Sequence, residues 1–170
     1  MGLIKRLRRK REPQGPRCAA VVPAAGSSRR MGGQDKILLP LDDIPVLMHT
    51  LRALSASERI QEIVVVTRED LIVPVGQLCR DCALDKVTKV LVGGATRADS
   101  VLIGVEEVSG RAKLIAVHDG ARPLVTVEVI DAAIRKAAEC GAAAPAVPVK
   151  DTVKRALDGV VVETPDRTQL

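Results

Sequence analysis

Short apolar runs alternate with helix-like stretches along most of this 170-residue chain, and this alternation limits the possible folds more than any other feature. Apolar, largely β-branched runs predict buried strands at 18–22, 63–66, 90–92, 114–117 and 142–147. Helical spacing of apolar residues predicts helices at 45–56, 69–84, 99–108 and 126–140, the second interrupted by Pro74. The pattern is typical of an α/β fold in which a mainly parallel sheet carries helices on both faces.

The pattern changes after this series. Two β-prone runs, 152–156 and 160–163, flank an Asp-Gly pair at 158–159, which is a strong hairpin signal. We therefore expect a β-hairpin arm at 148–166, projecting from a single domain that spans 17–170. Because an isolated hairpin is only marginally stable, the arm should rest on another surface, most economically on a second copy of the chain.

Positive charge is concentrated at the start of the chain. The first 11 residues hold six of the 26 Lys and Arg, which leaves 20 basic against 21 acidic residues elsewhere. The net charge of +5 therefore does not indicate a nucleic-acid partner. Residues 1–16 are interpreted as a basic N-terminal extension and linker, with a weak amphipathic membrane contact as the alternative. Without an export signal or a long apolar run, we expect a cytoplasmic protein with no stable membrane association.

Cysteine and aromatic content restrict the chemistry. Cys79 and Cys82 form a C-x-x-C pair, but there is no second pair, and neither His49 nor His118 lies at ligand spacing. Helix-face thiols are therefore favoured over a zinc or redox site. The chain has no Phe, Tyr or Trp, so its core must be aliphatic and any base must be bound without aromatic stacking.

Candidate site residues follow the predicted strands, at the edge where ligands bind to parallel sheets. The loop at 23–31 is rich in small residues and arginine, and Lys36 follows it. Backbone N–H groups and cations of this kind can bind a polyphosphate, although the sequence matches neither a Walker A nor a G-x-G-x-x-G pattern. A merely polar loop remains the alternative.

Two further loops also directly follow predicted strands. The Gly93-Gly94 turn precedes a predicted helix and offers backbone groups to a flat ligand edge, or it is a simple connection. Asp119 and Arg122 follow the strand at 114–117. The carboxylate could hold Mg²⁺ and the arginine a phosphate; the alternative is a local ion pair.

Four motifs in series resemble those of the 2-C-methyl-D-erythritol 4-phosphate cytidylyltransferase family. They are P-A-A-G at 23–26 with R-R-M at 29–31 and Lys36, G-G-x-x-R-x-x-S-V at 93–101, V-H-D-x-A-R-P at 117–123 and D-T-V-K at 151–154. The resemblance covers 18–170. It implies a Rossmann-like nucleotidyltransferase sheet, Mg²⁺ as cofactor and a homodimer formed through the arm. The implied reaction joins CTP to methylerythritol phosphate, releasing diphosphate, in isoprenoid precursor synthesis by the non-mevalonate pathway.

The resemblance also implies roles for single residues. The ribose and phosphate side of CTP would be lined by Ala24, Ala25 and Gly26, and the cytosine would face Gly93, Gly94 and Ser100. Arg30 and Lys36 would be the catalytic cations that bind the triphosphate and stabilise its developing charge. Asp119 would coordinate the metal. Arg122 would bind the acceptor phosphate, and Thr152 and Arg167 of the arm would complete that pocket in the partner subunit.

The sequence also departs from the family pattern. Ile37 and Leu38 follow the loop lysine where the family often has Gln and an aromatic residue, and Ala95 stands where an acidic residue is frequent. Family members continue past Leu170, so the C-terminal part of the family domain, with another metal-binding aspartate and a substrate lysine, is expected to be missing. Two alternatives stay open: a ribitol-5-phosphate or related polyol-phosphate cytidylyltransferase, and a non-catalytic nucleotide-binding fragment.

Overall fold

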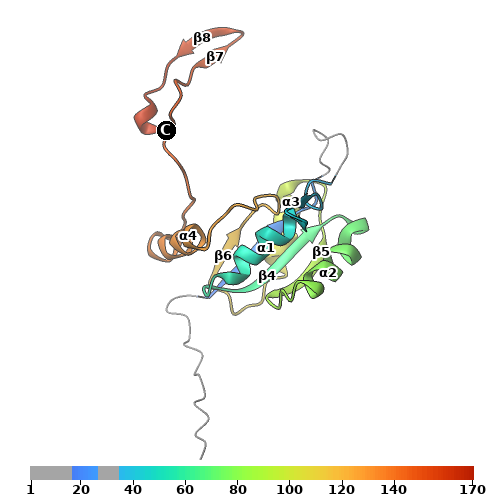
Figure 1. The fold of residues 1–170 in the computed structure, drawn as a ribbon. Coiled ribbons are helices and arrows are strands. Elements are labelled where there is room, and N and C mark those ends of the chain that lie inside the picture. Colours follow the sequence, from blue (N-terminus) through green and yellow to red (C-terminus); the bar gives the residue numbers. More distant parts are fainter. Residues whose placement is uncertain (1–16, 27–34) are drawn as a thin grey trace, which may run out of the picture.

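The computed structural model describes residues 17–26 and 35–170, and its centre is a four-stranded parallel sheet (Figure 1). The strands are β1 (Cys18–Pro23), β4 (Ile60–Thr67), β5 (Val87–Val92) and β6 (Leu114–Val117). They lie in the order β5-β4-β1-β6, and every neighbouring pair is parallel. Each comes from a predicted strand, and β4 and β5 begin three residues earlier than their apolar runs suggested.

Four helices cover the two faces of this sheet, as predicted. They are α1 (Val46–Ala56), α2 (Ile72–Asp81), α3 (Arg97–Glu106) and α4 (Val127–Cys140). Buried residues of α1, α2 and α4 pack in one cluster against one face. On the other face, Val105 of α3 packs against Val21, Val64 and Val66 of the sheet. Helices thus cover both faces of the sheet, which explains why its central strands are apolar on both faces.

The core is aliphatic throughout, because the chain has no aromatic residue. Its largest fully buried side chains include Leu47, Met48, Leu51 and Ile63. Helix and sheet are in close contact at one position of this core. At Gly104 of α3, an added Cβ would clash with the Val21 Cγ1 atom of β1.

Two sequence-based predictions are wrong. Pro74 does not interrupt a helix: α2 starts at Ile72, after the short 3-10 helix η2 (Glu69–Leu71), so Pro74 lies in its first turn, where no backbone N–H is needed. The stretch 142–147 is not a strand but exposed, irregular chain. Pro145 removes a backbone donor within this stretch, and Pro148 removes another directly after it. At this edge of the sheet, β6 is paired only with β1 among the described strands.

Two hairpins accompany the sheet. The first, missed from sequence, joins β2 (Pro40–Leu41) to β3 (Ile44–Pro45) through Asp42 and Asp43, both with positive φ. The second is the predicted arm, formed by β7 (Arg155–Leu157) and β8 (Val160–Glu163). Asp158 and Gly159 have φ of 48° and 79°, as a two-residue hairpin turn requires. The arm lies apart from the sheet (Figure 1), and all residues of both strands are exposed.

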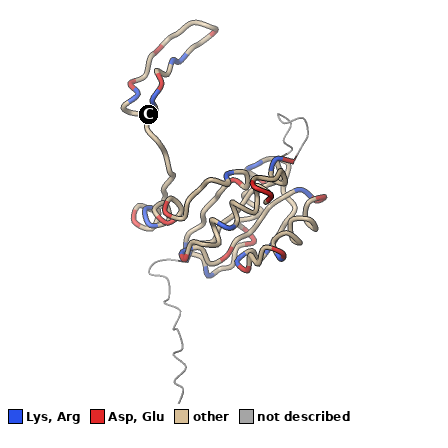
Figure 2. The backbone as a smooth tube through the Cα atoms, in the orientation of Figure 1, with Lys and Arg blue, Asp and Glu red and all other residues tan. Residues whose placement is uncertain are grey.

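Charged side chains are distributed over the described backbone with both signs interspersed (Figure 2). This agrees with the near balance of acidic and basic residues outside the N-terminal extension. Within the described residues, no helix has the length and apolar character needed to span a membrane.

Candidate active site

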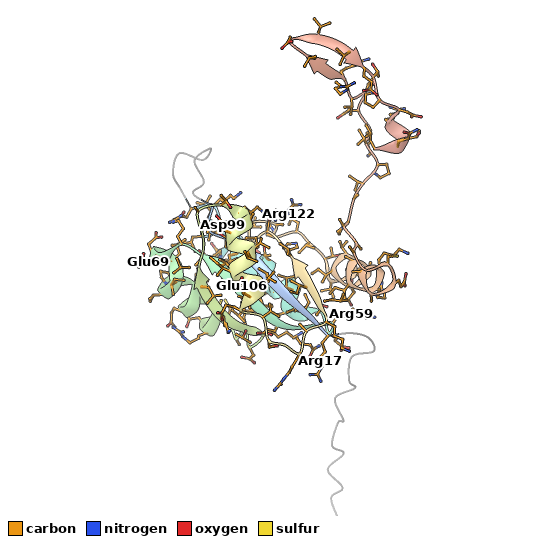
Figure 3. The ribbon with its side chains drawn as sticks, turned by 180° about the vertical axis from the view of Figure 1, so that it is seen from behind. Arg17, Arg59, Glu69, Asp99, Glu106 and Arg122 are labelled. Carbon is orange, nitrogen blue, oxygen red and sulfur yellow. The ribbon has the colours of Figure 1, made fainter. Side chains whose placement is uncertain are left out.

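A cleft of about 720 Å³ lies at the carboxyl edge of the sheet. Its walls come from the loop after β1, the turn between β5 and α3, the loop after β6, and the turn that carries Lys36. Figure 3 shows Asp99, in the first turn of α3, and Arg122, after β6, at this end of the sheet, whereas Arg17 and Arg59 lie at the opposite end. The topology thus brings together loops that are almost 100 residues apart in sequence, as expected for a parallel sheet.

The loop after β1 is hydrogen-bonded to the end of β4 and to the loop that follows β6. The Ala24 N–H donates to the Val66 carbonyl at 2.7 Å, and the Ala24 carbonyl accepts from the Thr67 hydroxyl at 3.3 Å. On the other side, the Gly120 N–H donates to the Pro23 carbonyl at 3.1 Å. These bonds fix the backbone at Pro23 and Ala24, where the loop leaves the sheet.

The Gly93-Gly94 turn is fixed by Ser100, which is only 2% exposed. The Ser100 hydroxyl accepts from the Gly94 N–H at 3.2 Å and donates to the Thr96 carbonyl at 3.0 Å. An added Cβ at Gly93 would lie 2.7 Å from the Ser100 Oγ and 2.9 Å from the Ala25 Cβ. Ser100 therefore lines the cleft while it shapes the turn, and the turn needs glycine for close approach rather than for positive φ.

The start of α3 completes this wall. Thr96 and Asp99 form a capping box in which the Asp99 N–H donates to the Thr96 hydroxyl and the Thr96 N–H donates to the Asp99 carboxylate. A Cβ at Gly94 would clash with the Asp99 side chain. The capping box thus fixes where α3 begins, and with it the position of Arg97 at the first helical residue.

Asp119 is the carboxylate of the cleft, and it is bound by two arginines. Arg97 Nη2 donates to Asp119 Oδ1 at 2.7 Å, and Arg122 Nε donates to Asp119 Oδ2 at 3.0 Å. The hydrogen bonds from Arg97, together with that from Arg122, hold the pKa of Asp119 below its ordinary value. Asp119 is therefore ionised at neutral pH. Sequence reasoning gave Arg97 no role, although this arginine stands inside the G-G-x-x-R motif.

Lys36 lines the same cleft from a tight turn. The N–H groups of Leu38 and Leu39 both donate to the Asp35 carbonyl, at 2.8 and 3.2 Å. Next to Lys36, Ile37 is buried in the core, and its carbonyl accepts from the Leu47 N–H at 2.9 Å. The lysine thus stands in a bonded turn, next to a residue that is anchored in the core.

The sequence and the fold of the chain are similar to those of known proteins. A sequence model of the 2-C-methyl-D-erythritol 4-phosphate cytidylyltransferase family matches residues 18–170. The chain belongs to this family. A relative of that name from Bacillus cereus is 41% identical over 151 residues, which cover 88% of this chain and 66% of the relative. One from Symbiobacterium thermophilum is 44% identical over 156 residues, covering 89% of this chain and 64% of the relative.

Solved structures of cytidylyltransferases share the fold. The crystal structure of 4-diphosphocytidyl-2C-methyl-D-erythritol synthase from Anaerococcus prevotii superposes with a TM-score of 0.75 at 25% identity, covering 91% of this chain and 66% of that one. The chain therefore spans slightly less than two thirds of the length of the curated relatives it matches. The predicted α/β nucleotidyltransferase fold is confirmed.

Most positions assigned from the cytidylyltransferase motifs converge on the cleft. Its lining includes Ala24, Ala25, Gly26, Lys36, Gly94, Ser100, Asp119 and Arg122. Gly93 lies directly behind it, packed against Ser100 and Ala25. Arg30, the other predicted catalytic cation, lies outside the described residues.

Two assigned residues lie elsewhere. Thr152 precedes β7 of the arm, and Arg167 lies in the short helix η3 (Arg167–Gln169) that follows β8. Arg167 Nη1 donates to the Lys150 carbonyl at 3.0 Å, so this helix closes the base of the arm. Because the arm lies apart from the sheet (Figure 1), these residues are not brought to the cleft of their own chain.

Two other groups were singled out from sequence, the Cys79–Cys82 pair and His118. Burial raises the pKa of the Cys79 thiol to about 11, and Arg52 Nη2 donates to Cys82 Sγ at 3.7 Å. Among the described residues, no group of three or more His, Cys, Asp or Glu side chains is placed to hold a metal. His118 is half-buried beside Asp119, and burial lowers the pKa of its imidazole, which is therefore neutral at pH 7.

Proposed function

We propose that this chain catalyses cytidylyl transfer from CTP to 2-C-methyl-D-erythritol 4-phosphate, giving CDP-methylerythritol and diphosphate. The observation that carries the proposal is the convergence of the family's motif residues from four separate segments on one cleft. The small residues Ala24–Gly26 would receive the ribose and phosphates of CTP, with Lys36 beside them. The Gly93-Gly94 turn would read the cytosine through backbone groups, which needs no aromatic side chain.

The chemistry requires charge neutralisation more than proton transfer. A phosphate monoester has a second pKa near 6, so the acceptor phosphate is mostly a dianion at neutral pH and needs no general base. One of its oxygens would attack the α-phosphorus of CTP, forming the new P–O bond while the bond to the diphosphate oxygen breaks. Arg30 and Lys36 would stabilise the negative charge that accumulates on the triphosphate.

Asp119 is the residue that would hold Mg²⁺. One carboxylate in the cleft fits this ion, because Mg²⁺ commonly takes one or two protein carboxylates and completes its shell with substrate phosphates and water. When bound, the ion would supply further neutralisation of the phosphate oxygens. Before the ion binds, Arg97 and Arg122 would keep Asp119 ionised and oriented at the cleft.

The acceptor side would be completed by a second copy of the chain. Arg122 lines the cleft and would bind the acceptor phosphate. Thr152 and Arg167 would join it from the arm of the partner, which is consistent with the exposure of the arm and its apolar residues Leu157, Val160 and Val161. We further propose a cytoplasmic location, with which four free cysteine thiols are consistent.

Release of diphosphate from CTP, measured with each acceptor separately, tests the proposal. We expect release with methylerythritol phosphate and Mg²⁺, and much less with ribitol 5-phosphate. Preference for ribitol 5-phosphate would change the proposed acceptor but leave the proposed CTP site unaffected. Binding of CTP without release with either acceptor would contradict the enzymatic proposal and leave a nucleotide-binding protein.

A further inference from the structure

An arginine directly after β4 forms an ion pair with the turn that carries Lys36. Arg68 follows Thr67, the last residue of β4, and its Nη2 donates to Asp35 Oδ2 at 2.9 Å. Its Nη1 donates to the other carboxylate oxygen, Oδ1, so the pair is bidentate. Arg68 also contacts Asp70, with Nε donating to Asp70 Oδ1 at 3.0 Å and Nη2 to Oδ2 at 2.7 Å.

The Asp35 half of this cluster is partly shielded from solvent. The side chains of Asp35 and Arg68 are 25% and 29% exposed, whereas that of Asp70 is 62% exposed. A bidentate arginine–carboxylate pair with restricted solvent access fixes the orientation of both groups more firmly than an exposed pair does. Of the two carboxylates, Asp35 is therefore the one that Arg68 holds in a defined position.

Arg68 is itself joined to a rigid part of the site. Its neighbour Thr67 accepts from the Gly93 N–H through its carbonyl at 2.7 Å and donates from its hydroxyl to the Ala24 carbonyl. The loop after β1 and the glycine turn are thus both bonded to Thr67. Through Arg68 and Asp35, the turn that carries Lys36 is connected to the same point of the sheet.

We propose that Arg68, acting through Asp35, is a positioning residue that sets the place of Lys36 in the cleft. The inference rests on the proposed function of Lys36. Ile37 anchors one side of the lysine in the core, and the Asp35–Arg68 pair anchors the other. A lysine side chain is long and flexible, so a fixed backbone on both sides limits the volume that its ammonium group samples.

The test compares Asp35→Asn with Asp70→Asn in the full chain. Each substitution removes one carboxylate charge next to Arg68, but only Asp35 belongs to the Lys36 turn. We expect Asp35→Asn to lower kcat about tenfold through loss of positioning. Asp70→Asn should change it by no more than about twofold, because an exposed pair contributes little. Arg68→Lys, which keeps the charge but loses the bidentate geometry, should fall between these two variants.

Coupling to Lys36 separates positioning from a general structural effect. If Asp35 acts through the lysine, Asp35→Asn should cause little further loss when Lys36→Ala is already present, and the two effects should not add. Full additivity of the two losses would overturn the inference. Equal losses in Asp35→Asn and Asp70→Asn would overturn it too.

Two further measurements test the inference without an activity assay. The Leu38 and Leu39 amides, which donate to the Asp35 carbonyl, should exchange with solvent about tenfold faster in Asp35→Asn than in Asp70→Asn. The affinity for CTP should fall about threefold in Asp35→Asn, as expected if the competent turn is populated for about a third of the time. Charge removal alone predicts the opposite sign, since losing an anion near the cleft favours a polyanionic ligand.

These outcomes keep the two proposals apart. A wild-type chain that binds CTP but releases no diphosphate would remove the proposed function, while amide exchange and CTP affinity would still decide the role of the Asp35–Arg68 pair. Unchanged exchange together with unchanged or tighter CTP binding in Asp35→Asn would overturn the inference, even in a fully active enzyme.

Discussion

Asp119 illustrates how single residues in the cleft depend on their neighbours. Both of its oxygens are bound by arginines from different segments, Arg97 at the start of α3 and Arg122 after β6. The arginines hold the pKa of this carboxylate below its ordinary value, and a metal ion would have to share its oxygens with them. Metal binding would therefore compete with at least one arginine, and the arginine so released could turn to the phosphates.

Replacing Lys36 by alanine should lower turnover about a hundredfold, because one cation that stabilises charge in the transition state is lost. The measurement is diphosphate release at saturating CTP. Lys89→Ala is a suitable control, since Lys89 of β5 pairs with Glu107 at the C-terminal end of α3 and does not line the cleft. Equal rates in Lys36→Ala and the wild type would take Lys36 out of the catalytic site.

His118 should make stability pH-dependent in the mildly acidic range. Burial lowers its pKa in the folded state, so the unfolded chain binds the proton first as the pH falls. The resulting stability is fully present above about pH 6.5 and is lost as the pH falls toward the folded pKa, by at most about 1.4 kcal/mol per pH unit. Urea unfolding at pH 7.5, 6.5 and 5.5 measures this loss. In His118→Leu the slope over this window should disappear; an unchanged slope would assign it to other groups.

At the scale of elements, the sequence was most informative where a pattern is local. β6 was predicted at its observed bounds, and the arm was predicted from one Asp-Gly pair. The errors came from tertiary context. The strand predicted at 142–147 has no observed partner, and Pro74 was judged without knowing where α2 begins. The β2–β3 hairpin was missed because Asp42-Asp43 lacks the glycine that usually marks such a turn.

The same contrast holds for the candidate site. The loops were predictable because each follows a strand of a parallel sheet, and the motifs identified most of their residues. The roles of Arg97 and Arg68 could not be predicted, because they depend on which carboxylates these side chains contact in the folded chain. The available signal at Arg68 was a basic residue two positions after the strand predicted at 63–66.

Gly104→Ala should destabilise the protein although alanine is the better helix former. The gain in helix propensity is about 1 kcal/mol, but the added methyl group would clash with Val21 and lie 3.0 Å from Val66 Cγ2, at an overpacking cost of about 1–3 kcal/mol. Gly76→Ala in α2 is a matched control, since its Cβ would meet only the end of the Arg80 side chain, at 3.7 Å. Chemical denaturation should show a lower midpoint for Gly104→Ala alone. A stabilised Gly104→Ala would mean that α3 moves away from the sheet at little cost.

At the scale of the whole molecule, the sheet domain and the arm contribute separately to stability. The core clusters contain only residues that precede the arm, and the strands of the arm are exposed on both faces. Removing residues 150–170 should therefore shift the thermal midpoint by less than about 2 °C at low protein concentration.

A protein concentration series completes this experiment. If arms from two copies associate, the intact chain should gain stability as its concentration rises, and the shortened chain should not. Analytical ultracentrifugation of both forms gives the corresponding oligomeric states. Identical, concentration-independent midpoints would argue against association through the arm.

The all-aliphatic core has a practical consequence for spectroscopy. With no indole, phenol or phenyl ring, the polypeptide is nearly transparent at 280 nm and has no intrinsic fluorescence. A cytosine nucleotide bound in the cleft would be almost the sole chromophore in the near ultraviolet. Its absorbance and circular dichroism could therefore be recorded directly on the complex, without a protein background to subtract.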